Sequence, residues 1–170
     1  MNAPPLTVIV MGVSGCGKSL VGSMLAQQLG GAFEDADDFH PPSNKAKMSQ
    51  GIPLNDEDRW PWYRILRDRI VQQRAAEKVY VLACSALKEI YRDKLRDGDG
   101  ADDLIFVYLK GSRALIGERI GARKGHYMPA SLLDSQFAAL EEPRDAIIVE
   151  VGGTPEEIVD SILKNLSSCR

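Results

Sequence analysis

The sequence predicts an α/β fold in which a five-stranded parallel sheet lies between two layers of helices. Two observations lead to this prediction. Short apolar runs, most of them rich in β-branched residues, alternate along the chain with segments whose apolar residues recur at helical spacing. The first run leads directly into a glycine-rich loop and a helix. The strand candidates are residues 7–11, 32–34, 79–84, 104–109 and 147–151.

Length and composition indicate a single domain over residues 1–170. A chain of 170 residues with 44% hydrophobic composition is long enough to bury one core, and no repeat or long linker divides it. The net charge of −3 gives no sign of a nucleic-acid partner, and no apolar run is long enough to cross a membrane. Three widely spaced cysteines without a CxxC pair favour free thiols. We therefore expect a cytoplasmic protein that binds neither nucleic acid nor membrane.

The loop after the first strand, residues 12–19, matches the phosphate-binding P-loop pattern G-x-x-x-x-G-K-[ST]. Its glycines let the backbone turn tightly and aim N–H groups at phosphate oxygens, at the start of a helix over residues 19–29. Lys18 can reach the β- and γ-phosphates, and the Ser19 hydroxyl can ligate Mg²⁺. Cys16 is interpreted as a small tolerated residue. The residues expected to bind the nucleoside triphosphate are Gly12, Val13, Ser14, Gly15, Cys16, Gly17, Lys18 and Ser19.

An acidic segment follows the second strand. Asp35 and Asp37 alternate, so in extended backbone their side chains would point the same way. We expect Asp37 to act as the base that accepts the proton of an acceptor hydroxyl, and Asp35 to lie nearer the metal. His40 is a further candidate for a hydroxyl contact. The alternative is an acidic turn whose carboxylates cap the following helix.

Residues 39–62 are expected to form a compact helical insertion that binds the second substrate. A short helix over residues 44–50 is followed by a longer one, for which Asp58 is the predicted N-cap and Pro61 lies in the first turn. Arg59 is a candidate cation for an anionic substrate. The two tryptophans of this segment are expected to pack in the core.

Two further cations follow the third strand. Ser85 is the predicted N-cap of a helix on which Lys88 and Arg92 share one face. Cations near a helix start favour a carboxylate or a phosphate; the alternative is a solvated basic face.

A basic stretch after the fourth strand is expected to form a mobile lid over about residues 119–131. Arg123 is the candidate for neutralising the transferring phosphoryl group, and Arg119 shares this role at the nucleotide. His126 in the lid and Gln136 in the next helix are candidates for substrate hydroxyls. After the fifth strand, Thr154 and Glu157 predict a capping box.

The chain resembles the gluconokinase family in blocks that follow one another in order through nearly its whole length. The blocks are residues 12–19, 35–41, 44–62, 84–93, 125–129 and 135–137. The resemblance implies an adenylate-kinase-like fold related to shikimate kinase, use of ATP with Mg²⁺, and phosphorylation of D-gluconate to 6-phosphogluconate. It also implies a homodimer.

The gluconate carboxylate requires a cation, for which the candidates are Arg59, Lys88 and Arg92. The hydroxyls would meet Asp37, His40, His126 and Gln136. Two other interpretations stay open. One is a kinase of another small hydroxylated acid such as shikimate, or of a nucleotide. The other is a regulatory protein that binds ATP without transferring phosphate.

Overall fold

The computed structural model describes residues 6–96, 104–122 and 130–168. The predicted α/β class is confirmed, and each of the five strands lies within one residue of its expected limits. In chain order the elements are β1 (Thr7–Met11), α1 (Lys18–Leu29), β2 (Ala32–Asp35), the 3₁₀ helix η1 (Ala36–Phe39), α2 (Pro42–Ser49), α3 (Asp56–Ala75), β3 (Tyr80–Ala83), α4 (Glu89–Arg96), β4 (Leu104–Lys110), α5 (Arg113–Ala122), α6 (Ala130–Ala139), β5 (Ile147–Glu150) and α7 (Pro155–Ser168).

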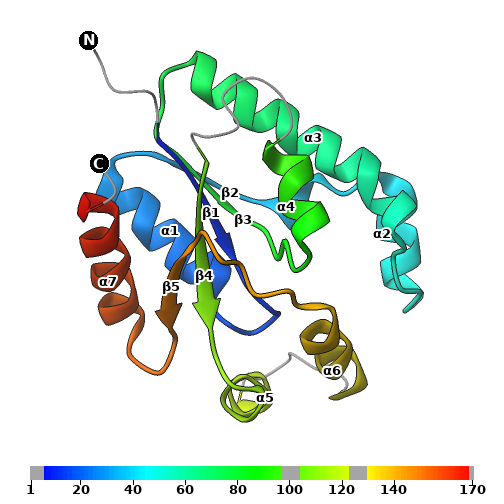
Figure 1. Ribbon diagram of the computed structural model, residues 1–170. Coiled ribbons are helices and arrows are strands. Elements are labelled where there is room, and N and C mark those ends of the chain that lie inside the picture. Colours follow the sequence, from blue (N-terminus) through cyan, green and yellow to red (C-terminus); the bar gives the residue numbers. More distant parts are fainter. Residues whose placement is uncertain (1–5, 97–103, 123–129, 169–170) are drawn as a thin grey trace.

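The five strands form one parallel sheet in the order β2-β3-β1-β4-β5. β1 lies at the centre, where Thr7 pairs with Tyr80 of β3 and with Leu104 of β4. Because every strand runs in the same direction, all carboxyl ends lie at one edge of the sheet. Figure 1 shows α5 and α6 beyond this edge. Ligands of open α/β sheets bind at the same edge.

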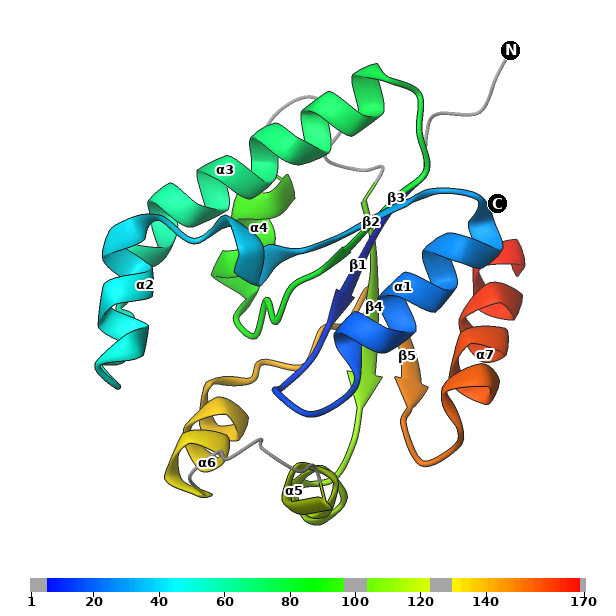
Figure 2. The same cartoon turned by 180° about the vertical axis from the view of Figure 1, so that it is seen from behind.

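Alternate side chains of β1 enter two cores, one on each face of the sheet. Val8 and Val10 are buried in a cluster with residues of α1 and α7, whereas Ile9 and Met11 are buried in a cluster with residues of α3 and α4. Figures 1 and 2 show these helix pairs on opposite faces. Each buried aliphatic side chain contributes roughly 1.5–3 kcal/mol of transfer free energy. This packing produces the three-layer arrangement and fixes the edge at which the strands end.

The start of α3 differs from the prediction. Asn55, not Asp58, is the N-cap, and its side chain accepts a 2.8 Å hydrogen bond from the Asp58 N–H. Asp58 is the third helical residue and accepts the Asn55 N–H at 3.0 Å, which completes a capping box. The reciprocal pair satisfies two backbone donors, whereas Asp58 as N-cap would satisfy one. Pro61 therefore lies inside the helix, beyond its first turn.

The predicted start of α7 is confirmed, but the predicted capping box is only half formed, because the Glu157 carboxylate meets the Thr154 hydroxyl and not the Thr154 N–H. The Thr154 hydroxyl accepts the Glu157 N–H at 3.2 Å and donates to the Glu157 carboxylate at 3.2 Å. Pro155 occupies the first helical position, where its missing N–H costs nothing. None of the helices in the described ranges has both the length and the apolar character of a membrane span.

Candidate active site

The P-loop connects β1 to α1 at the carboxyl edge of the sheet. Gly17 is the N-cap of α1 with φ of 98°, a left-handed conformation that favours glycine, and no side chain caps the helix there. The first N–H groups of an α-helix have no partner within the helix. At this end of α1 they combine with the positive end of the helix dipole, which makes an anion site.

Lys18 and Cys16 face different surroundings within this loop. The Lys18 ammonium folds back over the loop and donates to the Val13 carbonyl at 3.0 Å. The Cys16 side chain is buried in the core on the α1 side of the sheet, and burial raises the pKa of its thiol. Cys16 therefore packs as a small neutral residue, as the sequence indicated. Cys84 is also a buried free thiol, and Cys169 lies outside the described residues.

Ser19 and Asp35 lie in direct contact although they come from α1 and β2. The Ser19 hydroxyl donates to the Asp35 Oδ2, and the other carboxylate oxygen of Asp35 accepts the Asp37 N–H at 3.0 Å. A hydroxyl and a carboxylate beside a phosphate-binding loop are the hard oxygen ligands that Mg²⁺ prefers. The pair fits a magnesium ion that keeps several water ligands.

Asp37 does not lie in extended backbone, so the predicted parallel orientation of Asp35 and Asp37 is wrong. Asp35 ends β2 and caps η1, whereas Asp37 lies within η1. This cap allows the chain to turn directly after β2, because the Asp35 side chain accepts a hydrogen bond from the Asp37 N–H in the turn. The Asp37 side chain is 83% exposed and lies 3.7 Å from the buried His40 Nε2. The nearby His40 side chain holds the pKa of Asp37 below its usual value, so the carboxylate stays ionised at neutral pH.

An aromatic chain connects His40 with the far wall of the site. The His40 ring stacks on Trp62 at a centroid distance of 4.0 Å, Trp62 contacts Tyr63 at 4.9 Å, and Tyr63 stacks on Tyr91 at 5.5 Å. Trp62 also donates to the Ala36 carbonyl at 2.7 Å, which joins α3 to η1. Trp62 therefore packs in the core as expected, and its ring fixes the position of His40.

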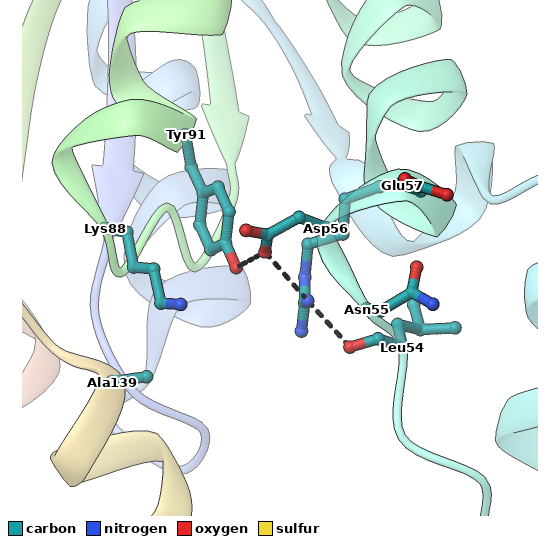
Figure 3. Close-up of a pocket in the computed structure, with 8 residues that line it drawn as sticks. Leu54, Asn55, Asp56, Glu57, Lys88, Tyr91 and Ala139 are labelled. Atoms are coloured by element: carbon teal, nitrogen blue, oxygen red, sulfur yellow. Dashed lines mark hydrogen bonds and ion pairs between the residues drawn. The ribbon is translucent and has the colours of Figure 1, made fainter.

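A pocket of about 640 Å³ lies at the opposite end of this row of aromatic rings, beside Tyr91. Its walls come from the start of α3, the start of α4 and the end of α6. In Figure 3 the Tyr91 hydroxyl meets Asp56 at the start of α3, and Lys88 extends into the open space beside this contact. The lining residues are Leu54, Asn55, Asp56, Glu57, Arg59, Lys88, Tyr91 and Ala139.

Arg59 and Lys88 are the cations among the described residues that line this pocket. Arg59 donates to the Leu54 carbonyl at 2.7 Å and lies 3.7 Å from the Asp56 carboxylate. Both cations lie over the Tyr91 ring, at 5.2 Å for Arg59 and 5.6 Å for Lys88. The Tyr91 hydroxyl donates to Asp56 at 2.6 Å, and burial together with this bond raises the pKa of Tyr91 to about 12.

Arg92 does not line the pocket, and the predicted shared helical face of Lys88 and Arg92 is wrong. The helix α4 begins at Glu89, and the Lys88 carbonyl accepts the N–H of Arg92, so Lys88 rather than Ser85 precedes the helix. Arg92 is 3% exposed, and burial lowers the pKa of its guanidinium. It donates to the carbonyls of Ala86 at 2.8 Å, Leu87 at 3.2 Å and Glu141 at 2.9 Å. It therefore joins the loop after β3 to the segment after α6.

The two helices that flank the expected lid differ in their polar contacts. Arg119 of α5 donates to the Val151 carbonyl just after β5. Gln136 of α6 binds Ser14 of the P-loop, with its Oε1 accepting the Ser14 N–H at 2.7 Å. The candidates Arg123 and His126 lie outside the described residues.

Sequence reasoning missed Asp56 and Tyr91 as pocket residues. Both fall in the blocks that carry the family resemblance, but neither has a spacing signal of its own, because their contact spans 35 residues. Two tyrosines and a histidine joined through Trp62 likewise have no local pattern. Only the fold brings them together.

Comparisons with known proteins agree on one group of kinases. The family model described as shikimate kinase matches residues 14–167. A probable gluconokinase of Xenopus tropicalis is 48% identical over 81% of this chain and 80% of its own length. The thermoresistant gluconokinase of Escherichia coli is 44% identical over 92% of this chain and 90% of its own length. The crystal structure of a gluconokinase from Sinorhizobium meliloti is 44% identical, covers 99% of this chain and 95% of that chain, and superposes with a TM-score of 0.88.

Proposed function

This chain belongs to the gluconokinase family, within the shikimate kinase group of P-loop kinases, and from that premise we propose how its residues transfer phosphate from ATP to D-gluconate. It is an ATP-dependent kinase that phosphorylates the 6-hydroxyl of D-gluconate and releases ADP. The shikimate alternative is less well supported, because the relatives at 44–48% identity over most of the chain are a gluconokinase and a probable gluconokinase.

The observation that carries this assignment of residues is the composition of the pocket. A space of about 640 Å³ lies within the usual range for small-molecule sites. Arg59 and Lys88 supply positive charge, while Asn55, Asp56 and the Tyr91 hydroxyl supply neutral and acidic hydrogen-bonding groups. One carboxylate and a chain of hydroxyls require this combination. Arg59 is the better carboxylate anchor, because a guanidinium offers two parallel donors.

On the nucleotide side, residues 12–19 would bind the phosphates, with Lys18 at the β- and γ-phosphates. Ser19 and Asp35 would hold the magnesium ion, which neutralises phosphate charge when bound. Arg119 would complete the nucleotide site, and Arg123 and His126 are assigned to the lid from the sequence alone. His40 acts through Asp37 rather than on substrate, since its ring is buried against Trp62.

In the transfer step, the 6-hydroxyl oxygen of gluconate forms a bond to the γ-phosphorus, and the bond from that phosphorus to the bridging oxygen of ADP breaks. The proton of the hydroxyl passes to the Asp37 carboxylate. Asp37 is suited to this role because it is exposed and ionised, with the His40 ring 3.7 Å away. Lys18 stabilises charge that develops on the bridging oxygen.

We also propose that the chain is one domain over residues 1–170 that acts as a homodimer in the cytoplasm. The segment 39–62 forms one side of the acceptor site, and the lid spans about residues 119–131. These assignments rest on the family resemblance and on the sequence.

A substrate panel tests this function. ADP release is measured with ATP, Mg²⁺ and, in separate reactions, gluconate, glucose, shikimate, other sugar acids and nucleoside monophosphates. Rapid release with gluconate and slow release with all others supports the proposal. Release that does not depend on any acceptor contradicts it.

A further inference from the structure

The Gln136 carboxamide makes two hydrogen bonds to a single residue of the P-loop. Its Oε1 accepts the Ser14 N–H at 2.7 Å, and its Nε2 donates to the Ser14 hydroxyl at 2.9 Å. The two residues are 122 positions apart in the chain. An acceptor and a donor on one rigid carboxamide match the donor and the acceptor of Ser14, so the pair fixes the orientation of the Ser14 peptide.

Gly15, the next residue of the loop, packs closely against α5, which flanks the other side of the expected lid. Gly15 has φ of 84°, and a Cβ on it would lie 2.6 Å from Ile120 Cγ1 of α5. Two consecutive loop residues are therefore in contact with α5 and α6. The end of α6 also reaches the acceptor pocket, because Ala139, three residues after Gln136, lines it.

We propose that Gln136 is a positioning residue of the nucleotide site, which pre-forms the P-loop through Ser14. It is not among the residues that line the pocket, so its polar atoms are engaged with the loop rather than with acceptor hydroxyls. Because Gln136 already satisfies the Ser14 N–H, the phosphates meet the N–H groups of the residues that follow. A loop held in its binding conformation loses less conformational freedom when the nucleotide binds.

Direct titration of ATP and of ADP, without gluconate, tests this inference on the loop alone. Gln136→Ala is expected to weaken both nucleotides about tenfold, as the loss of two hydrogen bonds implies. Ser135→Ala on the same helix is the matched control, because the Ser135 hydroxyl donates only to the Leu132 carbonyl within the helix. It is expected to leave nucleotide affinity unchanged. Gln136→Asn, one methylene shorter, repeats the test if the alanine variant folds poorly.

Steady-state kinetics form a second arm, which rests on the proposed function. Gln136→Ala is expected to raise the KM for ATP and to leave the KM for gluconate within about twofold. The effect on nucleotide affinity is expected to shrink in a Ser14→Ala background, because one of the two bonds is already absent there. Unchanged nucleotide affinity in both Gln136 variants overturns the proposal. A rise in the gluconate KM alone also overturns it, since Gln136 would then be an acceptor ligand. An inactive wild type that still shows the tenfold loss of nucleotide affinity would contradict the proposed function and not this inference.

Discussion

The Tyr91 hydroxyl donates a 2.6 Å hydrogen bond to the Asp56 carboxylate, joining α4 to the first residue of α3 across the pocket wall. Asp56 lies 3.7 Å from Arg59, so the tyrosine competes with the arginine for the same carboxylate. By engaging Asp56, Tyr91 leaves the Arg59 guanidinium freer to meet a substrate carboxylate.

Tyr91→Phe tests this relationship. The change keeps the ring beneath Arg59 and Lys88 but releases Asp56 toward Arg59. We expect the KM for gluconate to rise about three- to tenfold with little change in kcat, which corresponds to the net contribution of one ordinary hydrogen bond. Tyr108→Phe is the control, because the Tyr108 hydroxyl donates to Glu142, which does not line the pocket. Equal KM values for the Tyr91 variant and the wild type would contradict the interpretation.

Arg59→Ala is expected to raise the gluconate KM and to reduce the preference for gluconate over glucose. Glucose lacks the carboxylate and would leave the guanidinium unpaired, at a cost of at least about 1–3 kcal/mol. The first effect is measured as the KM for gluconate, and the preference is measured as the ratio of kcat/KM for gluconate to kcat/KM for glucose. If the preference survives in Arg59→Ala and falls in Lys88→Ala, Lys88 is the anchor.

Arg92→Ala is expected to reduce stability rather than substrate affinity. The buried guanidinium binds three carbonyl groups, one of them on Ala86, whose positive φ of 44° is a strained conformation. Its loss is expected to lower the free energy of unfolding by about 2–4 kcal/mol, measured by urea titration. A stable variant with a raised gluconate KM would contradict this and would indicate that Arg92 binds substrate.

Asp37→Asn is expected to lower kcat by about 10²–10⁴-fold with little change in the gluconate KM, because an amide cannot accept the proton. His40→Phe keeps the stacking on Trp62 but removes the contact that lowers the pKa of Asp37. We expect the pKa of Asp37, followed by carboxyl NMR, to lie below the ordinary aspartate value of 3.8 in the wild type and to rise in this variant.

The sign of the stability effect follows from the same pKa shift. Because the pKa of Asp37 is lower in the folded protein than in the unfolded chain, its contribution is fully present above the unfolded value of about 3.8. It is lost as the pH falls through the folded value. His40→Phe should therefore destabilise the protein above this window and have no effect through Asp37 below it. An Asp37 pKa that is the same in both proteins rules out the assigned contact.

Lys18→Ala is expected to abolish phosphoryl transfer while the fold stays intact. In the folded protein Lys18 donates to one loop carbonyl, so its removal disturbs no core contact. The loss should appear in kcat, since the charge that Lys18 stabilises develops in the transition state. Circular dichroism and the thermal midpoint serve as the folding controls. Near-normal turnover would contradict the assignment of the nucleotide site.

The sequence predicted those parts of the site whose residues lie close together in the chain. The P-loop is one contiguous strand-loop-helix unit, so its residue types and their order are sufficient to predict it. The role of Arg92 was not predictable. Ser85 was the predicted N-cap, whereas Lys88 precedes the helix, and Arg92 donates to buried carbonyls instead of facing the pocket. The contact between Ser14 and Gln136 spans 122 residues and has no local signal. The N-cap of α3 was predicted at Asp58 and lies at Asn55, because the reciprocal pair satisfies two backbone donors where Asp58 as N-cap would satisfy one.

Identification of the product tests directly whether this protein phosphorylates gluconate at its 6-hydroxyl. Wild-type protein is incubated with ATP, Mg²⁺ and gluconate, and the products are followed by ³¹P and ¹³C NMR with Lys18→Ala as the control. We expect ADP together with a phosphate ester at the 6-carbon of gluconate, in equal amounts, and neither product with Lys18→Ala. ADP with free inorganic phosphate, or an ester at another carbon, would contradict it.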